Sequence, residues 1–170
     1  GAVSSYDSVF NLTDVNFVQN VAGPNGQQGG DDWSGFGGAL WAAGSSGRIF
    51  SSTFSANVAR GGGSSREARG GAVYLFAGDQ LRFESCLFEE NQASATGIAA
   101  GGAVFLQEFD TKPSFLFTEF RDNQAVNLDQ DDQYSRGGAI YCEVRTEPYV
   151  LGNVFLRNSA EWGSAIYSTN

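Results

Sequence analysis

The chain has 170 residues, of which 41% are hydrophobic and 14% aromatic, so it carries enough apolar surface for a folded core and is not a disordered tail. Glycine is abundant at 23 residues, whereas charged residues make up only 17%, which is typical of turn-rich β structure. The net charge of −9 has the wrong sign for a phosphate backbone or an anionic membrane surface, which excludes nucleic acid as an expected partner.

A glycine-glycine-alanine-aliphatic motif recurs along the chain. It is complete at residues 37–40, 70–73, 101–104 and 137–140, with partial copies at residues 1–3 and 163–166. A second motif, Phe-x-x-Asn, follows each of the first five copies, at Phe17/Asn20, Phe54/Asn57, Phe88/Asn91, Phe120/Asn123 and Phe155/Asn158. The two motifs alternate without exception, so the sequence is an internal repeat.

The two arms of this repeat differ in how constant their lengths are. From the motif alanine to the next phenylalanine the separations are 15, 15, 16, 17 and 16 residues. From the asparagine to the next alanine they are 19, 15, 12, 16 and 7 residues. A nearly constant arm belongs to a stacked framework, whereas an arm of variable length lies on the surface, so we expect variable loops at one corner.

The constant arm predicts short strands. Residues 72–75 and 81–84 are rich in β-formers or alternate, and glycines interrupt every longer window, so each repeat supplies about three strands. A repeat of this size cannot bury its apolar face alone, but stacking at the interstrand spacing of ~4.8 Å places like residues above like. The predicted fold class is all-β, a parallel β-helix (solenoid) of about five coils and the first strand of a sixth.

The paired motifs GGA[ILV] and FxxN resemble the polymorphic outer membrane protein repeat, found in the passenger domains of bacterial autotransporter adhesins and in other secreted surface proteins. The resemblance covers essentially the whole chain, although Gly1 has lost its partner glycine and Ser164 replaces the second glycine of the last copy. It implies a right-handed parallel β-helix, an extracellular or cell-surface location, and adhesive or structural roles without catalytic residues.

Residues 1–170 are expected to form one β-helix domain, a fragment or processed segment of a longer repeat array. The chain begins with Gly1, contains no methionine, and starts and stops in phase with its repeat. No window approaches about 18 consecutive apolar residues and no basic-then-apolar leader opens the chain, so we expect neither a signal peptide nor membrane insertion by this segment.

The motif asparagines follow a core phenylalanine by three residues, where the chain must turn. Asparagine tolerates the left-handed conformation of such corners, and its amide can bond to the copy one coil away. We expect an inward structural ladder of Asn20, Asn57, Asn91, Asn123 and Asn158 beside Phe17, Phe54, Phe88, Phe120 and Phe155. The alternative is a row of amides that binds a ligand, although stacked buried amides normally satisfy one another.

Each motif aliphatic is followed by an aromatic residue in five of the six copies. Because neighbouring strand residues face opposite sides, the aliphatics and the aromatics cannot both point inward. We place the aliphatics in the core, which leaves an outward column as a candidate binding strip: Trp41, Tyr74, Phe105, Tyr141 and Tyr167. These rings either cover the sheet and stabilise neighbouring coils or form a platform for sugars or another protein.

The sequence offers no catalytic site, resident metal or cofactor. A glycoside hydrolase needs carboxylates that converge across a cleft, and the acidic residues gather instead in variable loops, at Asp31 and Asp32 and at Asp129, Asp131 and Asp132. The second group is weighed as a calcium site but lacks the glycine and the terminal glutamate of a calcium-binding hand. Asn11 begins an N-glycosylation triplet and is expected to face outward.

The two cysteines are expected to be unbonded core residues, because Cys86 and Cys142 lie two coils apart, beyond disulfide reach.

The predicted function is that of a non-catalytic extracellular or cell-surface protein that mediates adhesion or builds a fibre. Its expected partners are another protein, by end-to-end self-association or as a cell-surface receptor, or a glycan. The alternative is a carbohydrate-binding or carbohydrate-active β-helix protein of the lyase or hydrolase kind.

Overall fold

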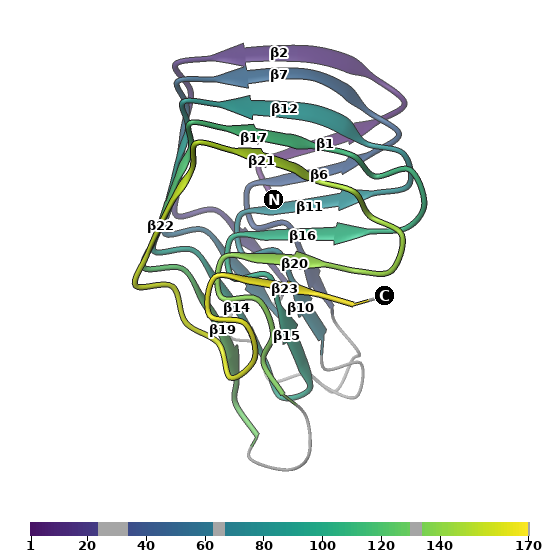
Figure 1. Ribbon diagram of the computed structural model, residues 1–170. Helices are drawn as coiled ribbons and strands as arrows, with labels where there is room; N and C mark the ends of the chain where they lie inside the picture. Colours follow the sequence, from purple (N-terminus) through teal and green to yellow (C-terminus); the bar gives the residue numbers. More distant parts are fainter. Residues whose placement is uncertain (24–33, 63–66, 130–133, 170) are drawn as a thin grey trace.

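Successive repeats lie side by side in five sheets, as the computed structural model shows (Figure 1). The structure describes residues 1–23, 34–62, 67–129 and 134–169. Within a sheet, each strand pairs in parallel with the same position of the next coil, so that Val73 pairs with Leu40 on one side and with Val104 on the other. Like residues therefore stand above like, which is the condition for ladders along the axis.

The constant arm of the repeat forms three of these sheets. Sheet A contains β1 (Val3–Tyr6), β6 (Leu40–Ala43), β11 (Val73–Phe76), β16 (Val104–Gln107), β20 (Ile140–Cys142) and β23 (Ile166–Ser168). Sheet B contains β2 (Val9–Thr13), β7 (Ser46–Phe50), β12 (Gln80–Glu84), β17 (Ser114–Leu116) and β21 (Tyr149–Leu151). Sheet C contains β3 (Asn16–Val18), β8 (Thr53–Ser55), β13 (Leu87–Glu89), β18 (Glu119–Arg121) and β22 (Val154–Leu156). The chain passes from β1 to β23 in five circuits, which confirms the all-β parallel β-helix of about five coils.

The variable arm adds two further sheets, and so is not only a loop. Sheet D contains β4 (Val21–Ala22), β9 (Val58–Arg60), β14 (Gln92–Ala95) and β19 (Gln124–Asn127). Sheet E contains β5 (Gly35–Phe36), β10 (Glu67–Arg69) and β15 (Ile98–Ala100), continued by bridges through Arg136 and Trp162. Residues 24–33, 63–66 and 130–133, which include Asp31, Asp32, Asp131 and Asp132, fall between these two sheets in sequence and outside the described residues.

Sheets D and E form a thin extension that projects from the body made by sheets A, B and C (Figure 1). Its interior is a separate cluster of small buried side chains: Ala59, Ala68, Ala93, Ala95 and Ala99. Alanine lets two sheets approach closely, so the extension needs no wide core. The sequence pattern missed it because alanine is a weak marker of strands.

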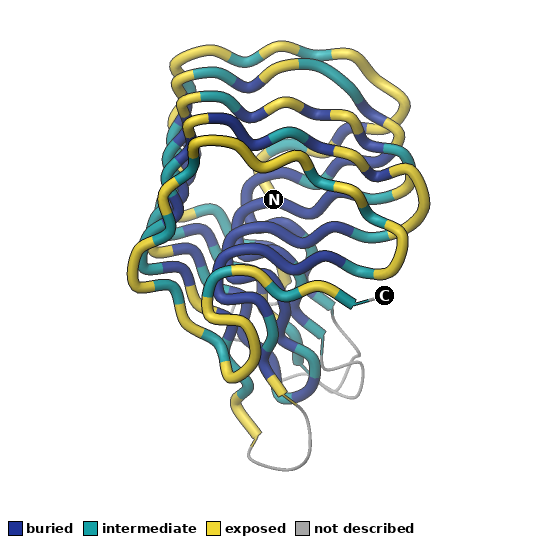
Figure 2. The backbone as a smooth tube through the Cα atoms, viewed as in Figure 1, coloured by how far each residue is buried: buried dark blue, intermediate teal, exposed yellow. Residues whose placement is uncertain are grey.

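The body encloses the main core. The motif aliphatics point inward, as expected, and Leu40, Val73, Val104 and Ile140 are buried together with the motif phenylalanines of the first four coils, whereas Phe155 of the last coil is partly buried. The longest buried stretches run along sheet A in the central coils, whereas exposed positions are frequent in the first and last coils (Figure 2).

The glycine pair of the repeat marks the neck between the body and the extension. Gly70 has a φ of 66°, a left-handed conformation that glycine adopts without strain. A Cβ at Gly71 would lie 2.0 Å from the carbonyl oxygen of Gly102 and 2.6 Å from the backbone nitrogen of Gln92 in sheet D. The second glycine is therefore required because backbone from two directions fills the place of a side chain.

Candidate functional site

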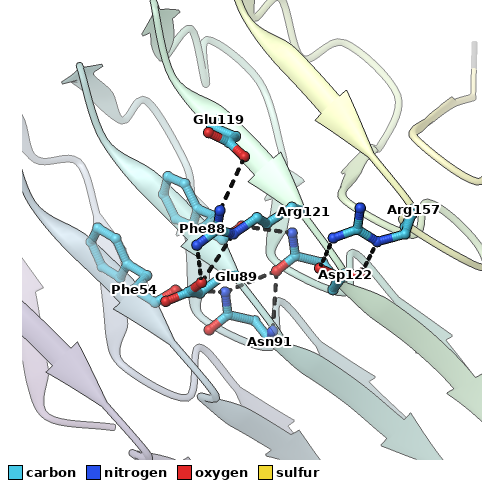
Figure 3. Close-up of polar contacts among 9 residues, drawn as sticks. Phe54, Phe88, Glu89, Asn91, Glu119, Arg121, Asp122 and Arg157 are labelled. Atoms are coloured by element: carbon cyan, nitrogen blue, oxygen red, sulfur yellow. Dashed lines mark hydrogen bonds and ion pairs between the residues drawn. The ribbon is translucent and has the colours of Figure 1, made fainter.

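The motif asparagines form a continuous hydrogen-bonded column at the corner between sheets C and D. Asn91 donates from Nδ2 to Oδ1 of Asn123 at 2.9 Å, and Asn57 donates in the same way to Asn91. The other Nδ2 hydrogen of Asn91 is donated to the carbonyl oxygen of Phe54, also at 2.9 Å (Figure 3). The same pattern joins the column from Asn20 to Asn158. The amides of the buried central members are thereby used within the column, which leaves no row of free amides there for a ligand.

The motif phenylalanines stack beside this column. Phe54 and Phe88 lie 4.5 Å apart between ring centroids with an interplanar angle of 3°. The neighbouring pairs have centroid separations of 4.7, 4.8 and 5.0 Å from Phe17 to Phe155. Stacking in register at the coil spacing gives each of the three inner rings two partners in the column, so these residues form an inner wall of the body.

Two further polar columns stabilise the other corners of the body, and the sequence pattern gave no sign of them. Between sheets B and C, Thr118 accepts the Cys86 N–H and donates its hydroxyl to the carbonyl of Leu116. Ser52 acts in the same way in an earlier coil, and Asn153 of the next coil accepts the Thr118 N–H but donates to the carbonyl oxygen of Phe115 in the previous coil. No single residue type repeats in these columns, and for this reason motif searching does not find them.

Asp79 lies in the third polar column, between sheets A and B. Its side chain is fully buried, with Oδ1 accepting the Ser45 N–H at 2.7 Å and Oδ2 accepting the Phe76 N–H at 2.8 Å. Burial raises the pKa of Asp79 to about 6, although the two backbone hydrogen bonds act in the opposite direction. A buried carboxyl group that has only amide partners is easier to protonate than an exposed one.

The expected exposure of the aromatic column is wrong. Tyr74, Phe105 and Tyr141 point away from the body core, as predicted, but are only 5%, 2% and 6% exposed, and Trp41 and Tyr167 are half-buried. The extension folds back over sheet A and covers these rings. In the central coils of the described chain, the aromatic side chains of sheet A therefore do not form a contiguous exposed strip that a partner could contact.

Side chains of sheet E close this second, aromatic core. The guanidinium of Arg69 lies 5.1 Å from the ring centre of Phe105, and its Nη1 donates to Oε1 of Gln107 at 2.7 Å. The hydroxyl of Tyr74 bonds to the same Oε1, and burial raises the pKa of Tyr74 to about 12. These contacts hold the extension against the body, so the aromatic column serves packing between the two parts.

The outer surface carries cross-coil ion pairs (Figure 3). Arg121 pairs with Glu89 of the previous coil at 2.6 Å, and Arg157 makes a two-pronged contact with Asp122, with both distances at 2.7 Å. The hydrogen bonds from Arg157 hold the pKa of Asp122 below its usual value. Because these groups are partly exposed, each pair contributes little to stability.

Both cysteines are free and buried in the main core. Cys142 pairs in register with Leu106, which is the inward position predicted for it. Burial raises the pKa of the Cys142 thiol to about 11 and raises that of Cys86 as well. Neither thiol is set up to act as a nucleophile.

The remaining candidate sites stay unassigned. Asp129 is exposed, whereas Asp131 and Asp132 lie outside the described residues, so calcium binding by these three residues stays a hypothesis. Within the described ranges, no three His, Cys, Asp or Glu side chains gather in a metal-binding group. Asn11 is exposed in β2, as expected, and its Oδ1 accepts the Arg48 N–H. The described part of the chain contains no helix long and apolar enough to cross a membrane.

The stacked coils, the asparagine ladder and the phenylalanine column define a parallel β-helix repeat protein. Residues 117–143 match the family model of the Chlamydia polymorphic membrane protein repeat. This stretch contains Phe120, Asn123 and the complete glycine motif at residues 137–140, so it spans one repeat of the kind that recurs throughout the chain. The match and the solenoid together confirm the resemblance to a polymorphic membrane protein β-helix and support, coarsely, a surface-associated repeat protein. No curated protein and no solved structure matched the chain.

Proposed function

We propose that this chain is a non-catalytic segment of an extracellular or cell-surface protein and mediates adhesion. The observation that carries the proposal is the match of residues 117–143 to a repeat of polymorphic membrane proteins. The structure adds a physical rationale, because the repeated residues are used in the core and the ladders. The residues that vary between coils include those on the outward faces and in the corner loops, where a rigid scaffold presents contact residues.

Attachment of coated beads to cells tests the proposal. Beads that carry the folded chain should attach to a panel of cultured cells and to extracellular matrix proteins. The matched control is the chain with both Asn57→Ala and Asn91→Ala, which removes two central ladder residues and leaves the surface composition almost unchanged. Attachment by the folded chain and not by the control supports adhesion through the folded surface. Equal attachment by both, or none by the folded chain, contradicts it.

A second candidate function, growth of a fibre by end-to-end association, is favoured by the polarity of the asparagine ladder. Asn20 donates its backbone N–H and its Nδ2 to Asn57, while its own Oδ1 accepts nothing from the described residues. Asn158 accepts from Asn123, and its backbone N–H has no acceptor among the described residues. The first coil therefore offers a hydrogen-bond acceptor, the Asn20 Oδ1, and the last coil offers a donor, the Asn158 N–H. Stacking the last coil of one chain on the first coil of another requires this complementary pair.

The last coil also exposes inward-facing apolar residues. Val150 is 38% exposed and Ile166 is 40% exposed, although their counterparts in the previous coil, Phe115 and Ile140, are buried. Sedimentation and electron microscopy over a concentration series should show filaments that a Val150→Lys variant abolishes. Val154→Lys, an outward position of the same coil, is the control. A monomer at every concentration contradicts the fibre.

A further inference from the structure

Two lengthened corner loops depart from the repeat pattern. The linkers between sheets A and B span residues 7–8, 44–45 and 77–79 in the first three coils, but residues 108–113 and 143–148 in the next two. The stacked framework does not need these additions, since the earlier coils turn the same corner without them. Loop insertions on a rigid scaffold are common locations for binding residues.

The two loops are joined by a backbone hydrogen bond from the Glu147 N–H to the Thr111 carbonyl oxygen at 3.1 Å, with a salt bridge beside it. Lys112 of the first loop pairs with Asp110 at 3.3 Å and reaches Glu147 of the second loop at 3.2 Å. The hydroxyl of Thr111 donates to the Gln107 carbonyl, and that of Thr146 donates to the Glu143 carbonyl, each at 2.8 Å. Their geometry is thus set before any ligand arrives, which lowers the entropic cost of binding.

Between the loops lies a cavity of about 290 Å³ with a mixed lining: Gln107, Glu108, Phe109, Glu143, Val144 and Arg145. This volume is near the lower end of small-molecule sites, which suits a single ring. The Arg145 guanidinium lies over the Phe109 ring, 4.0 Å from its centre, and Phe109 as a whole is 54% exposed, so part of this side chain is open to solvent.

The polar groups of the cavity are positioned by the aromatic core beneath it. Gln107 is held by Arg69 and by the Tyr74 hydroxyl, and Glu143 lines the cavity beside it. Burial raises the pKa of Glu143, with Arg69 lowering it and Glu108 raising it further. The cavity therefore combines two carboxylates, an amide and a guanidinium around an open aromatic ring.

We propose that this cavity binds one ring of a neutral saccharide. Carboxylates accept hydrogen bonds from ring hydroxyls, Arg145 donates to ring or hydroxyl oxygens, and the open part of the Phe109 ring packs against the apolar face of the sugar. The carboxylates of Glu108 and Glu143 disfavour uronic and sialic acids by like-charge repulsion. The saccharide site rests on the proposed adhesion in one respect, which is that it names the class of ligand through which adhesion would occur.

Saturation-transfer NMR on the intact chain tests this proposal with the methyl pyranosides of glucose, galactose, mannose and N-acetylglucosamine, and with methyl glucuronide as the charged comparison. At least one neutral pyranoside should bind, and the glucuronide should bind at least tenfold more weakly. Phe109→Ala and Glu143→Gln should each weaken binding at least tenfold. Phe117→Ala and Glu90→Gln, which change exposed residues outside the cavity, should leave binding unchanged.

Three results would overturn the saccharide site: no binding of any neutral pyranoside, equal binding of the glucuronide, or binding that persists in both cavity variants. Binding of an arginine-containing peptide in place of the sugars would assign the cavity to a protein partner and also overturn it. Because both cavity changes lie in exposed or half-buried positions, circular dichroism should show folded variants. Bead attachment that persists without sugar binding leaves adhesion standing, so the two proposals fail separately.

Discussion

Oδ1 of Asn123 accepts two hydrogen bonds from Asn91, one from Nδ2 at 2.9 Å and one from the backbone N–H at 3.1 Å. The side chain of each inner ladder residue therefore closes the corner of the previous coil as well as its own. Buried amides in this arrangement have most of their hydrogen-bonding capacity satisfied without water. The ladder is thus a cooperative element, in which the loss of one member affects the coils on both sides.

The first prediction is that Asn91→Ala destabilises the fold by about 3 kcal/mol, since it leaves several buried groups without partners. The Asn57 N–H and Nδ2 lose their acceptor, and the Phe54 carbonyl loses its donor. Denaturant titration followed by circular dichroism measures the change in free energy of unfolding.

Gln124→Ala is the matched control, because Gln124 is exposed and directly follows Asn123 in the ladder. It should change the free energy of unfolding by less than about 0.5 kcal/mol. Equal losses from the two substitutions would show that the ladder does not stabilise the corner.

The second prediction concerns the pH dependence that Asp79 imposes. Its folded pKa of about 6 lies above the value of about 3.9 expected in the unfolded chain, so the folded state binds the proton more tightly. The resulting stabilisation is fully present below about pH 4 and is lost as the pH rises through about 6, a change of roughly 2–3 kcal/mol.

Comparison with Asp79→Ser isolates this contribution, because Ser45 occupies the same corner one coil earlier. Denaturant titrations at pH 4.5 and pH 7.5 should show a larger loss of stability with rising pH in the original chain than in the variant. The same pH dependence in both proteins would mean that other groups produce it.

The third prediction follows from the burial of the aromatic column. Phe105→Ala should destabilise the fold by about 3–5 kcal/mol, as expected for removal of a buried phenylalanine ring. Phe117→Ala, at an exposed phenylalanine, should cost far less. Thermal unfolding measures both, and a Phe105 variant as stable as the Phe117 variant would indicate that the extension does not cover the column in solution.

The fourth prediction is that both thiols are unreactive in the folded chain. Cys86 and Cys142 are buried with raised pKa values, so a thiol reagent at pH 8 should label them slowly until denaturant is added. Reductant should leave the melting temperature unchanged. A Cys86–Cys142 peptide pair in a non-reduced digest would contradict the register of the coils.

The repeat motifs were sufficient to predict the parallel β-helix, the number of coils and the inward aliphatic positions. They are sufficient because stacking forces each structural position to repeat in sequence, so that periodic glycine, phenylalanine and asparagine report periodic geometry. The register of Leu106 with Cys142 shows how far this reasoning extends, since both residues lie in the inward column expected for them.

The extension, the burial of the aromatic column and the cavity were decided only by the tertiary structure. Alternation assigns Tyr74 and Phe105 to the outer face of a sheet, but it says nothing of a second layer that folds over that face. Asp79 and Gln107 appear in no motif, because each depends on a contact with a residue about one coil away in sequence, Ser45 for Asp79 and Arg69 for Gln107. Sequence periodicity reports what repeats along the axis of the β-helix. The burial of one sheet face by a second layer, and the formation of a cavity between loops, depend instead on how different parts of each coil pack against one another.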